Sequence, residues 1–119
     1  KGDKKEAYDA RPVRKPKYFN IKHDRNAPIE IDLHIEELLD TTAGMTNKDI
    51  LDYQLETFRR VLRENQSRHG QRIVFIHGKG DGILRAALKS ELERKSDHYS
   101  FQDASFQRYG FGAMLVIVR

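Results

Sequence analysis

Hydrophobic and polar residues alternate in four short stretches of the chain. Residues 29–34 read Ile-Glu-Ile-Asp-Leu-His, the period of two expected of a strand with one buried face. Residues 72–76, Arg-Ile-Val-Phe-Ile, form an apolar run that is typical of a central strand covered on both sides. Tyr99 and Phe101 alternate with polar neighbours, and residues 113–118 are apolar throughout. The pattern therefore predicts four strands.

Two segments between these predicted strands carry apolar residues at helical spacing. Thr46 followed by Asp49 resembles a capping box, and apolar residues then recur at helical spacing as far as Gly70, a common helix stop. They are Leu51, Leu55, Phe58 and Leu62. A second helix carries Leu84, Leu88 and Leu92 and ends near Lys95. Residues 36–40 could form a helical turn, and residues 41–44 look like a loop. The predicted order is β-α-β-α-β-β.

This order predicts the α/β class with a four-stranded mixed sheet. Two strand-helix units imply parallel pairing of the early strands, and the short link between the last two strands permits a hairpin or a reversal. In a two-layer fold, the apolar last strand would leave one side needing a partner or the N-terminal segment.

The N-terminal segment differs in composition from the rest. Residues 1–27 hold nine Lys or Arg, four Asp or Glu and two of the three prolines. They carry few apolar side chains besides Tyr18, Phe19 and Ile21, which could add a strand or lie against the domain. We expect a flexible basic linker over residues 1–27 and one domain over 28–119. Because the chain starts at Lys1, we also expect an upstream domain.

Composition narrows the functional classes. A chain of 119 residues predicts one domain, and the lack of cysteine excludes disulfides and thiolate chemistry. No apolar run predicts a membrane span, and no leader for export is visible, so a cytoplasmic location is expected. Residues 28–56 carry a net charge of −7, whereas residues 57–95 carry +6. The basic part is either a phosphate-binding face or an ordinary solvated surface.

A glycine-rich turn follows the predicted central strand. Residues 77–82 read His-Gly-Lys-Gly-Asp-Gly and lead into a helix, where free N–H groups and the helix dipole attract anions. The spacing fits neither a P-loop nor a dinucleotide fingerprint. Gly78, Gly80 and Gly82 could equally supply only a tight turn. His77, Lys79 and Arg85, crowded around them, favour a phosphate cradle.

Asp32 and His34 end the first predicted strand, two residues apart. Parallel pairing would place His77 at the matching end of the neighbouring strand, so a carboxylate and two imidazoles would meet. Such a set can act as acid and base, or hold a divalent cation, in phosphodiester hydrolysis. Alternatively, Asp32 caps a turn and His34 binds backbone. His23, His69 and His98 lack comparable partners.

Three motifs in order resemble those of the Smr (small MutS-related) domain family. Ile31-Asp32-Leu33-His34 resembles "LDLH", and residues 77–85 resemble "HGKGxGxLR". Tyr109-Gly110-Phe111-Gly112, leading into the last strand, is similar to the "GGxG" turn. The likeness covers residues 29–119 and is greatest to the C-terminal Smr domain of the second class of bacterial MutS-like proteins.

The resemblance implies a two-layer sandwich like the C-terminal domain of the third translation initiation factor. It also implies nicking of DNA or cleavage of RNA. Two departures affect the site. Ile35-Glu36-Glu37 and an apparent insertion replace the usual residues after "LDLH", and the aromatic residues in the last turn are bulkier and able to stack a base.

The leading hypothesis is a phosphodiester endonuclease that binds DNA or RNA. Asp32 and His34 would act as acid and base or as ligands of Mg²⁺ or Mn²⁺, and His77 as a second proton donor or phosphate ligand. The phosphate cradle would comprise Gly78, Lys79, Gly80, Gly82 and Arg85. One alternative is a non-catalytic module that binds nucleic acid or a ribosome through the face from Arg59 to Lys95 and the glycine loop. The other is an assembly domain.

Overall fold

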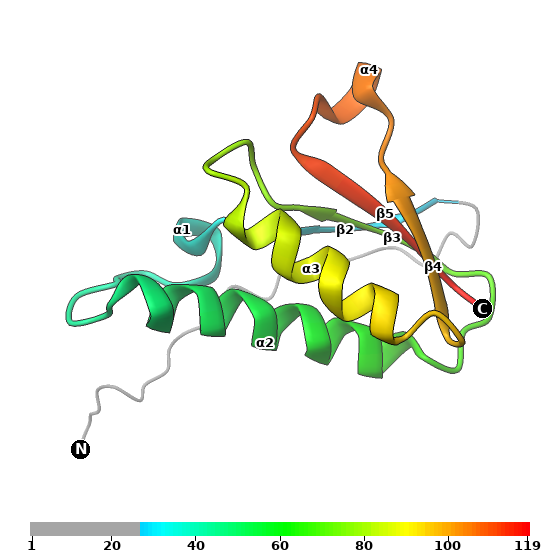
Figure 1. The fold of residues 1–119 in the computed structure, drawn as a ribbon, viewed down its shortest axis with the longest axis horizontal. Helices are drawn as coiled ribbons and strands as arrows, with labels where there is room; N and C mark the ends of the chain where they lie inside the picture. The colour runs from blue at the N-terminus through cyan, green and yellow to red at the C-terminus, as the bar shows by residue number, and fades with distance from the viewer. Residues whose placement is uncertain (1–26) are drawn as a thin grey trace.

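The computed structural model describes residues 27–119, which form a sheet and two long helices (Figure 1). The predicted N-terminal linker, including Tyr18, Phe19 and Ile21, lies outside the described residues except for Ala27. In chain order the elements are β2 (Ile29–Asp32), α1 (Ile35–Leu38), α2 (Asn47–Asn65), β3 (Arg72–Ile76), α3 (Ile83–Arg94), β4 (Tyr99–Asp103), α4 (Phe106–Tyr109) and β5 (Ala113–Val118). None of these helices is long and apolar enough to cross a membrane.

The four strands form one mixed sheet in the order β2-β3-β5-β4. The α2 crossover makes β2 parallel to β3, as predicted, with Asp32 opposite Ile76. The last strand, β5, inserts antiparallel between β3 and β4 and pairs with both. This insertion brings the start of β5 beside the end of β3, where the predicted site begins.

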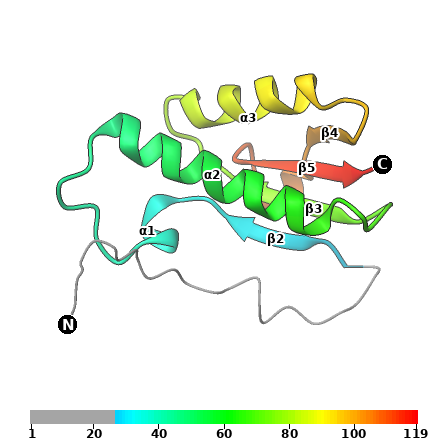
Figure 2. The same ribbon diagram turned by 90° about the horizontal axis from the view of Figure 1, so that it is seen from below.

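Helices α2 and α3 run side by side over one face of the sheet (Figures 1 and 2). Alternate strand residues point to this face because side chains in a strand alternate between its two sides. The buried core there comprises Ile31, Leu33, Leu55, Phe58, Val61, Leu62, Ile73, Phe75, Leu88, Leu92, Tyr99, Met114, Val116 and Val118. The predicted two-layer α/β architecture is confirmed.

The long helix begins where the sequence predicts. The Thr46 side chain accepts a hydrogen bond from the Asp49 N–H, and the Asp49 carboxylate accepts one from the Thr46 N–H, which completes the capping box. The helix ends at Asn65, earlier than expected, and the chain turns at Gly70, where φ is +90°.

A smaller apolar cluster lies on the other face of the sheet. Val74, Ala104 and Ala113 are buried there, with Ile76, Tyr109 and Leu115 packed against them. Tyr109 comes from α4, a helical turn within the segment that joins β4 to β5 and that the sequence pattern did not predict. The last strand is apolar on both faces, as predicted, and Tyr109 supplies part of the cover for its second face.

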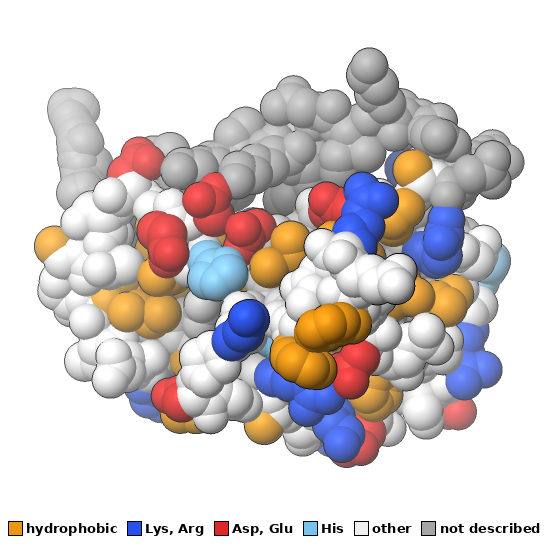
Figure 3. All heavy atoms as spheres, turned by 90° about the horizontal axis from the view of Figure 1, so that it is seen from above, with side chains coloured by type: hydrophobic (Ala, Val, Ile, Leu, Met, Phe, Trp, Pro, Cys, Tyr) orange, Lys and Arg blue, Asp and Glu red, His pale blue; other side chains and the backbone are white. Residues whose placement is uncertain are grey.

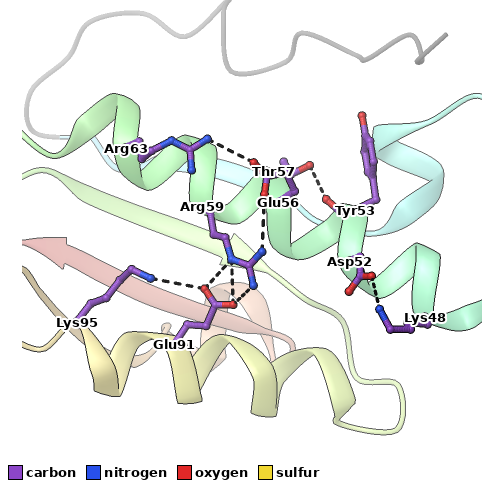
Figure 4. A network of polar contacts seen from close by, with 9 residues as sticks. All are labelled: Lys48, Asp52, Tyr53, Glu56, Thr57, Arg59, Arg63, Glu91 and Lys95. Atoms are coloured by element: carbon purple, nitrogen blue, oxygen red, sulfur yellow. Dashed lines mark hydrogen bonds and ion pairs between the residues drawn. The ribbon is translucent and has the colours of Figure 1, made fainter. Parts of the chain in front are cut away.

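A buried ion pair joins the two long helices (Figure 4). Arg59 on α2 makes a two-pronged contact with the Glu91 carboxylate on α3, with Nε at 3.0 and 3.1 Å from the two oxygens. Lys95 approaches the same carboxylate at 3.7 Å. Burial alone raises the pKa of Glu91, but the hydrogen bonds and charge of Arg59 outweigh it and lower the pKa below its ordinary 4.5.

The two halves of this pair differ in exposure, which predicts unequal effects of removing them. The Glu91 side chain is 6% exposed and that of Arg59 is 40% exposed. Replacing Arg59 with Met leaves the buried carboxylate with only the longer contact to Lys95, so it should lower the free energy of unfolding by roughly 2 kcal/mol. Glu91→Gln should cost less, because the freed guanidinium can reach water. Urea unfolding of both variants at neutral pH checks this, and equal losses would contradict it.

The same pair predicts a pH dependence of stability. A carboxylate whose pKa is lowered by folding stabilises the protein above its unfolded-state pKa, here 4.5. This stabilisation is lost as the pH falls through the lower pKa of the folded state. The stability difference between the wild type and Glu91→Gln should therefore shrink once the pH falls below the ordinary value. A difference that stays constant down to acid unfolding would contradict this.

Candidate active site

The candidate site lies where the carboxyl ends of β2 and β3 meet. Beyond the paired residues Asp32 and Ile76, the Leu33 N–H donates to the Ile76 carbonyl at 2.8 Å. The Gln54 side chain on α2 donates to the Leu33 carbonyl at 2.9 Å. These bonds fix the chain just before His34. Continuing the register of β2 and β3 places His77 opposite Leu33 and Gly78 opposite His34.

Asp32 holds His34 in one orientation. The Asp32 Oδ1 atom accepts hydrogen bonds from the His34 backbone N–H at 2.9 Å and from the ring Nδ1 at 2.7 Å. Because a carboxylate only accepts, the proton of the neutral ring sits on Nδ1 and the lone pair on Nε2. One oxygen of Asp32 thus stabilises the turn and orients the imidazole.

The imidazole of His34 lies directly against Gly78. A Cβ atom at residue 78 would come within 2.5 Å of His34 Nε2, and φ there is +81°. Both facts require glycine. The His34 side chain is 41% exposed, so its Nε2 edge faces the glycine turn and remains within reach of solvent.

His77 is buried beside it, 8% exposed. Its Nδ1 donates to the Gly78 carbonyl at 2.8 Å, which again leaves the lone pair on Nε2. Within residues 27–119, Nε2 is a buried atom without a hydrogen-bond partner. Burial lowers the pKa of His77 below its ordinary 6.5 and outweighs the opposing effect of the Gly78 bond, so the ring stays neutral at neutral pH.

The start of β5 packs on the glycine turn. The N–H groups of His77 and Gly78 both donate to the Gly112 carbonyl, at 2.8 and 3.0 Å. A Cβ atom at Gly112 would come within 3.1 Å of the Gly78 backbone. The Gly78 N–H is therefore used internally and does not point to a ligand, unlike the role the sequence suggested for it.

The rest of the turn leaves donors open. The N–H groups of Gly80 and Gly82 make no hydrogen bond with the described residues, and Gly82 is the N-cap of α3. Asp81 accepts from the Ile83 N–H at 3.1 Å, which closes the entry to the helix. Two open amides at a helix N-terminus form an arrangement that attracts phosphate.

The predicted basic residues differ in their partners. Lys79 is exposed and has no ion-pair partner among residues 27–119. Arg85 instead pairs with Asp103 on β4 at 2.9 Å, an exposed contact worth little in stability. Figure 3 shows this end of the molecule, where acidic, histidine and basic side chains gather around exposed hydrophobic ones.

Three residues that frame the site were not among the site residues predicted from the sequence. Asp103 binds Arg85, Gly112 supplies the carbonyl that fixes the turn, and Tyr109 donates its hydroxyl hydrogen to the Glu30 carboxylate. The glycines after Tyr109 were a usable signal for Gly112. Nothing in the sequence links Tyr109 to Glu30, which are 79 residues apart.

The structure does not assemble a metal-ligand cluster in the part that it describes. Residues 27–119 contain no group of three or more His, Asp, Glu or Cys residues placed to hold a metal ion. Asp32 and His34 remain the only candidate ligands for Mg²⁺ or Mn²⁺, and that assignment stays a prediction.

A shallow groove of about 250 Å³ lies at the opposite end of the sheet. It is lined by Arg59, Leu62, Arg63, Gln66, Lys95, His98 and Tyr99. Arg59 and Lys95 face Glu91, and Arg63 approaches Glu56 at 3.4 Å, so much of the positive charge predicted for this face is neutralised locally.

Comparisons with known proteins agree on one family. The sequence model of the Smr domain matches residues 44–119, a range that includes His77 and the glycine turn and begins after His34. The crystal structure of the Smr domain of Thermus thermophilus MutS2 superposes with a TM-score of 0.57 and 29% sequence identity. The alignment covers 76% of this chain and 96% of that one. No curated protein matches the chain.

The contact between His34 and Gly78 can be tested with two glycines in the same turn. Gly78 and Gly82 have similar φ values, +81° and +85°, but only at Gly78 would a Cβ atom meet a neighbour. Gly82→Ala should lower the free energy of unfolding by roughly 1 kcal/mol through backbone strain alone. Gly78→Ala should cost more and shift the NMR signals of the His34 ring. Equal costs, with the His34 signals unmoved, would contradict the geometry.

Proposed function

Because this chain belongs to the Smr domain family, we propose that it binds nucleic acid and cleaves a phosphodiester bond where β2 and β3 end. The domain would span residues 28–119. Smr domains form a family of nucleic-acid-binding, nuclease-type modules, and the substrate here would be DNA or RNA. The observation that carries the proposal is the meeting of two imidazoles at one glycine turn beside an open helix N-terminus.

His34 is the proposed general base. Its Nδ1 proton is held by Asp32 at 2.7 Å, so Nε2 is the atom that can accept a proton from an attacking hydroxyl or water. The carboxylate stabilises the imidazolium that then forms, as in other carboxylate-imidazole pairs. The proton can return to the departing oxygen or pass to solvent.

The glycine turn is the proposed phosphate site. The open N–H groups of Gly80 and Gly82 and the N-terminus of α3 would bind the nonbridging oxygens, and the unpaired Lys79 ammonium would add charge. Gly78 would serve differently from the other glycines, because its lack of a side chain makes room for His34. Arg85 would reach phosphate only by leaving Asp103.

His77 is proposed as a hydrogen-bond acceptor in place of the proton donor that the sequence suggested. Its Nδ1 proton is given to Gly78, and burial keeps the ring neutral, so Nε2 can accept but not donate. Because Nε2 is buried in the structure, it would accept from the substrate or the attacking water only once binding exposes it.

A binding module without catalysis is the second candidate. Two observations favour it: the family match begins after Asp32 and His34, and α1 follows His34 directly, where the sequence departs from the family motif. This alternative retains the phosphate site and gives no role in bond cleavage to His34.

Removing the general base separates the two candidates. His34→Ala should lower the nicking rate on the order of 100-fold or more, the usual contribution of a positioned acid or base, while affinity barely changes. The matched control is His98→Ala, because His98 is an exposed histidine at the opposite end of the sheet. This variant should cleave at the wild-type rate. Supercoiled plasmid and structured RNA, each with Mg²⁺, Mn²⁺ or EDTA, provide the assay.

Two results would overturn the nuclease proposal in favour of the binding module. One is cleavage by His34→Ala at the wild-type rate. The other is binding by the wild type without cleavage above a mock preparation that lacks the protein.

The phosphate site predicts a change in salt dependence. Lys79→Ala should weaken binding to all sequences alike and lower the slope of log affinity against log salt by about one. Arg68→Ala removes an exposed positive charge before β3, at the other end of the sheet, and should change neither as much. Equal effects of the two substitutions would show that binding follows net charge alone.

A further inference from the structure

Two phenylalanines are exposed together beside the candidate site. Phe106 is 59% exposed and Phe111 is 74% exposed, and their ring centroids lie 4.5 Å apart. Single exposed apolar residues are common on protein surfaces, but two aromatic rings in mutual contact and open to solvent form a patch that marks an interaction site.

The backbone fixes this pair next to the glycine turn. The Gly110 N–H donates to the Phe106 carbonyl at 2.7 Å, and Gly110 has φ of +67°, so the chain reverses and brings Phe111 back to Phe106. The next residue, Gly112, packs on Gly78 and accepts hydrogen bonds from His77 and Gly78. Phe111 is therefore the residue next to Gly112, which contacts the turn that holds the proposed phosphate, and Phe106 lies against Phe111.

Tyr109, which is close in sequence to both phenylalanines, is held by other contacts and does not form part of the exposed pair. Tyr109 packs in the smaller apolar cluster, and its hydroxyl donates to the Glu30 carboxylate. These contacts anchor α4 across the sheet to β2. They hold the platform formed by Phe106 and Phe111 in place, and leave those two rings as the exposed ones.

The surroundings of the platform carry positive charge. Arg108, between the two rings in sequence, is 71% exposed and stays 3.6 Å from Glu30, a separation too long for a strong pair. Lys79 and Arg85 lie on the adjoining turn and helix. Figure 3 shows exposed hydrophobic side chains on this face, with Lys and Arg as well as Asp and Glu side chains next to them.

We propose that Phe106 and Phe111 stack on unpaired bases of the strand whose phosphate is bound at the glycine turn. The proposal rests on the phosphate site proposed above and adds a substrate class: single strands, or unpaired segments within structured nucleic acid. An unpaired base offers a free face to an aromatic ring, whereas a base within a duplex offers only its edges.

The platform favours nucleic acid over a protein partner because of its setting. Apolar rings beside the unpaired Lys79 and the exposed Arg108 suit a ligand that alternates flat bases with negative phosphates. An apolar protein segment would gain nothing from the adjoining open amides of Gly80 and Gly82, which suit an anion.

The chain contains no tryptophan, so Phe111→Trp introduces a single fluorescent reporter into the platform. Titration with a single-stranded oligonucleotide should quench this tryptophan, because stacked bases quench indole emission. A blunt duplex of the same length should quench it far less. A tryptophan placed by His98→Trp, at the opposite end of the sheet, should respond to neither.

A second pair of variants tests stacking without a reporter. Phe106→Leu and Phe111→Leu keep an apolar side chain but lose the aromatic face, so affinity for the single strand should fall roughly 10-fold while affinity for the duplex hardly changes. Phe111→Trp keeps an aromatic ring, so it should match or exceed the wild type in its preference for the single strand over the duplex. Because the rings are exposed, none of these changes should affect folding, and urea unfolding verifies that.

Three results would overturn the platform. Equal quenching by single strand and duplex would contradict the proposed preference for unpaired bases. Unchanged affinity for the single strand in both leucine variants would contradict stacking on the two rings. Quenching that depends on protein concentration without nucleic acid would show that the patch contacts a second copy of the chain.

The platform and the nuclease proposal can fail separately. Quenching by single strands together with absent cleavage would keep the platform and overturn catalysis. Cleavage that depends on His34 but is indifferent to both leucine variants would keep catalysis and overturn the platform.

Discussion

The close packing of Gly112 on Gly78 is the constraint on which the rest of the site depends. A Cβ atom on either glycine would collide, with the His34 ring in one case and with the Gly78 backbone in the other. The missing side chain of Gly112 lets the start of β5 approach the end of β3, where one carbonyl accepts from two N–H groups, and the missing side chain of Gly78 makes room for His34. The same contact positions three further groups: the imidazole of His34, that of His77 and the ring of Phe111.

The sheet and helices hold this contact from outside the site. The parallel pairing of β2 with β3 fixes the position of His34 along the sheet. The Gln54 side chain on α2 donates a hydrogen bond to the carbonyl of Leu33, the residue before His34. The ion pair of Arg59 with Glu91 joins α2 to α3 and so fixes the helix whose N-terminus faces the proposed phosphate. Positioned groups of this kind contribute to catalysis because they need little reorganisation during the reaction.

The sequence predicted the parts of the molecule that local pattern controls. Alternation and helical spacing located the four strands and two long helices, and the parallel crossover rule predicted that the ends of β2 and β3 are neighbours. The insertion of β5 between β3 and β4 is a long-range choice, however, and the use of the Gly78 N–H by Gly112 follows from it. The contacts of Tyr109 with Glu30 and of Phe106 with Phe111 also need α4, a helical turn too short to give a periodic signal.

The central claim is that His34 and His77 lie at the same glycine turn and form one site that responds to one ligand. The most direct test is NMR of the imidazole nitrogens during titration with a short single-stranded oligonucleotide. In the free protein both rings should carry a proton on Nδ1, as their bonds to Asp32 and Gly78 require. On titration, the Nε2 signals of both residues should move over the same concentration range while His98 stays unchanged. A response of one ring without the other, or of neither while the oligonucleotide binds, would contradict the account.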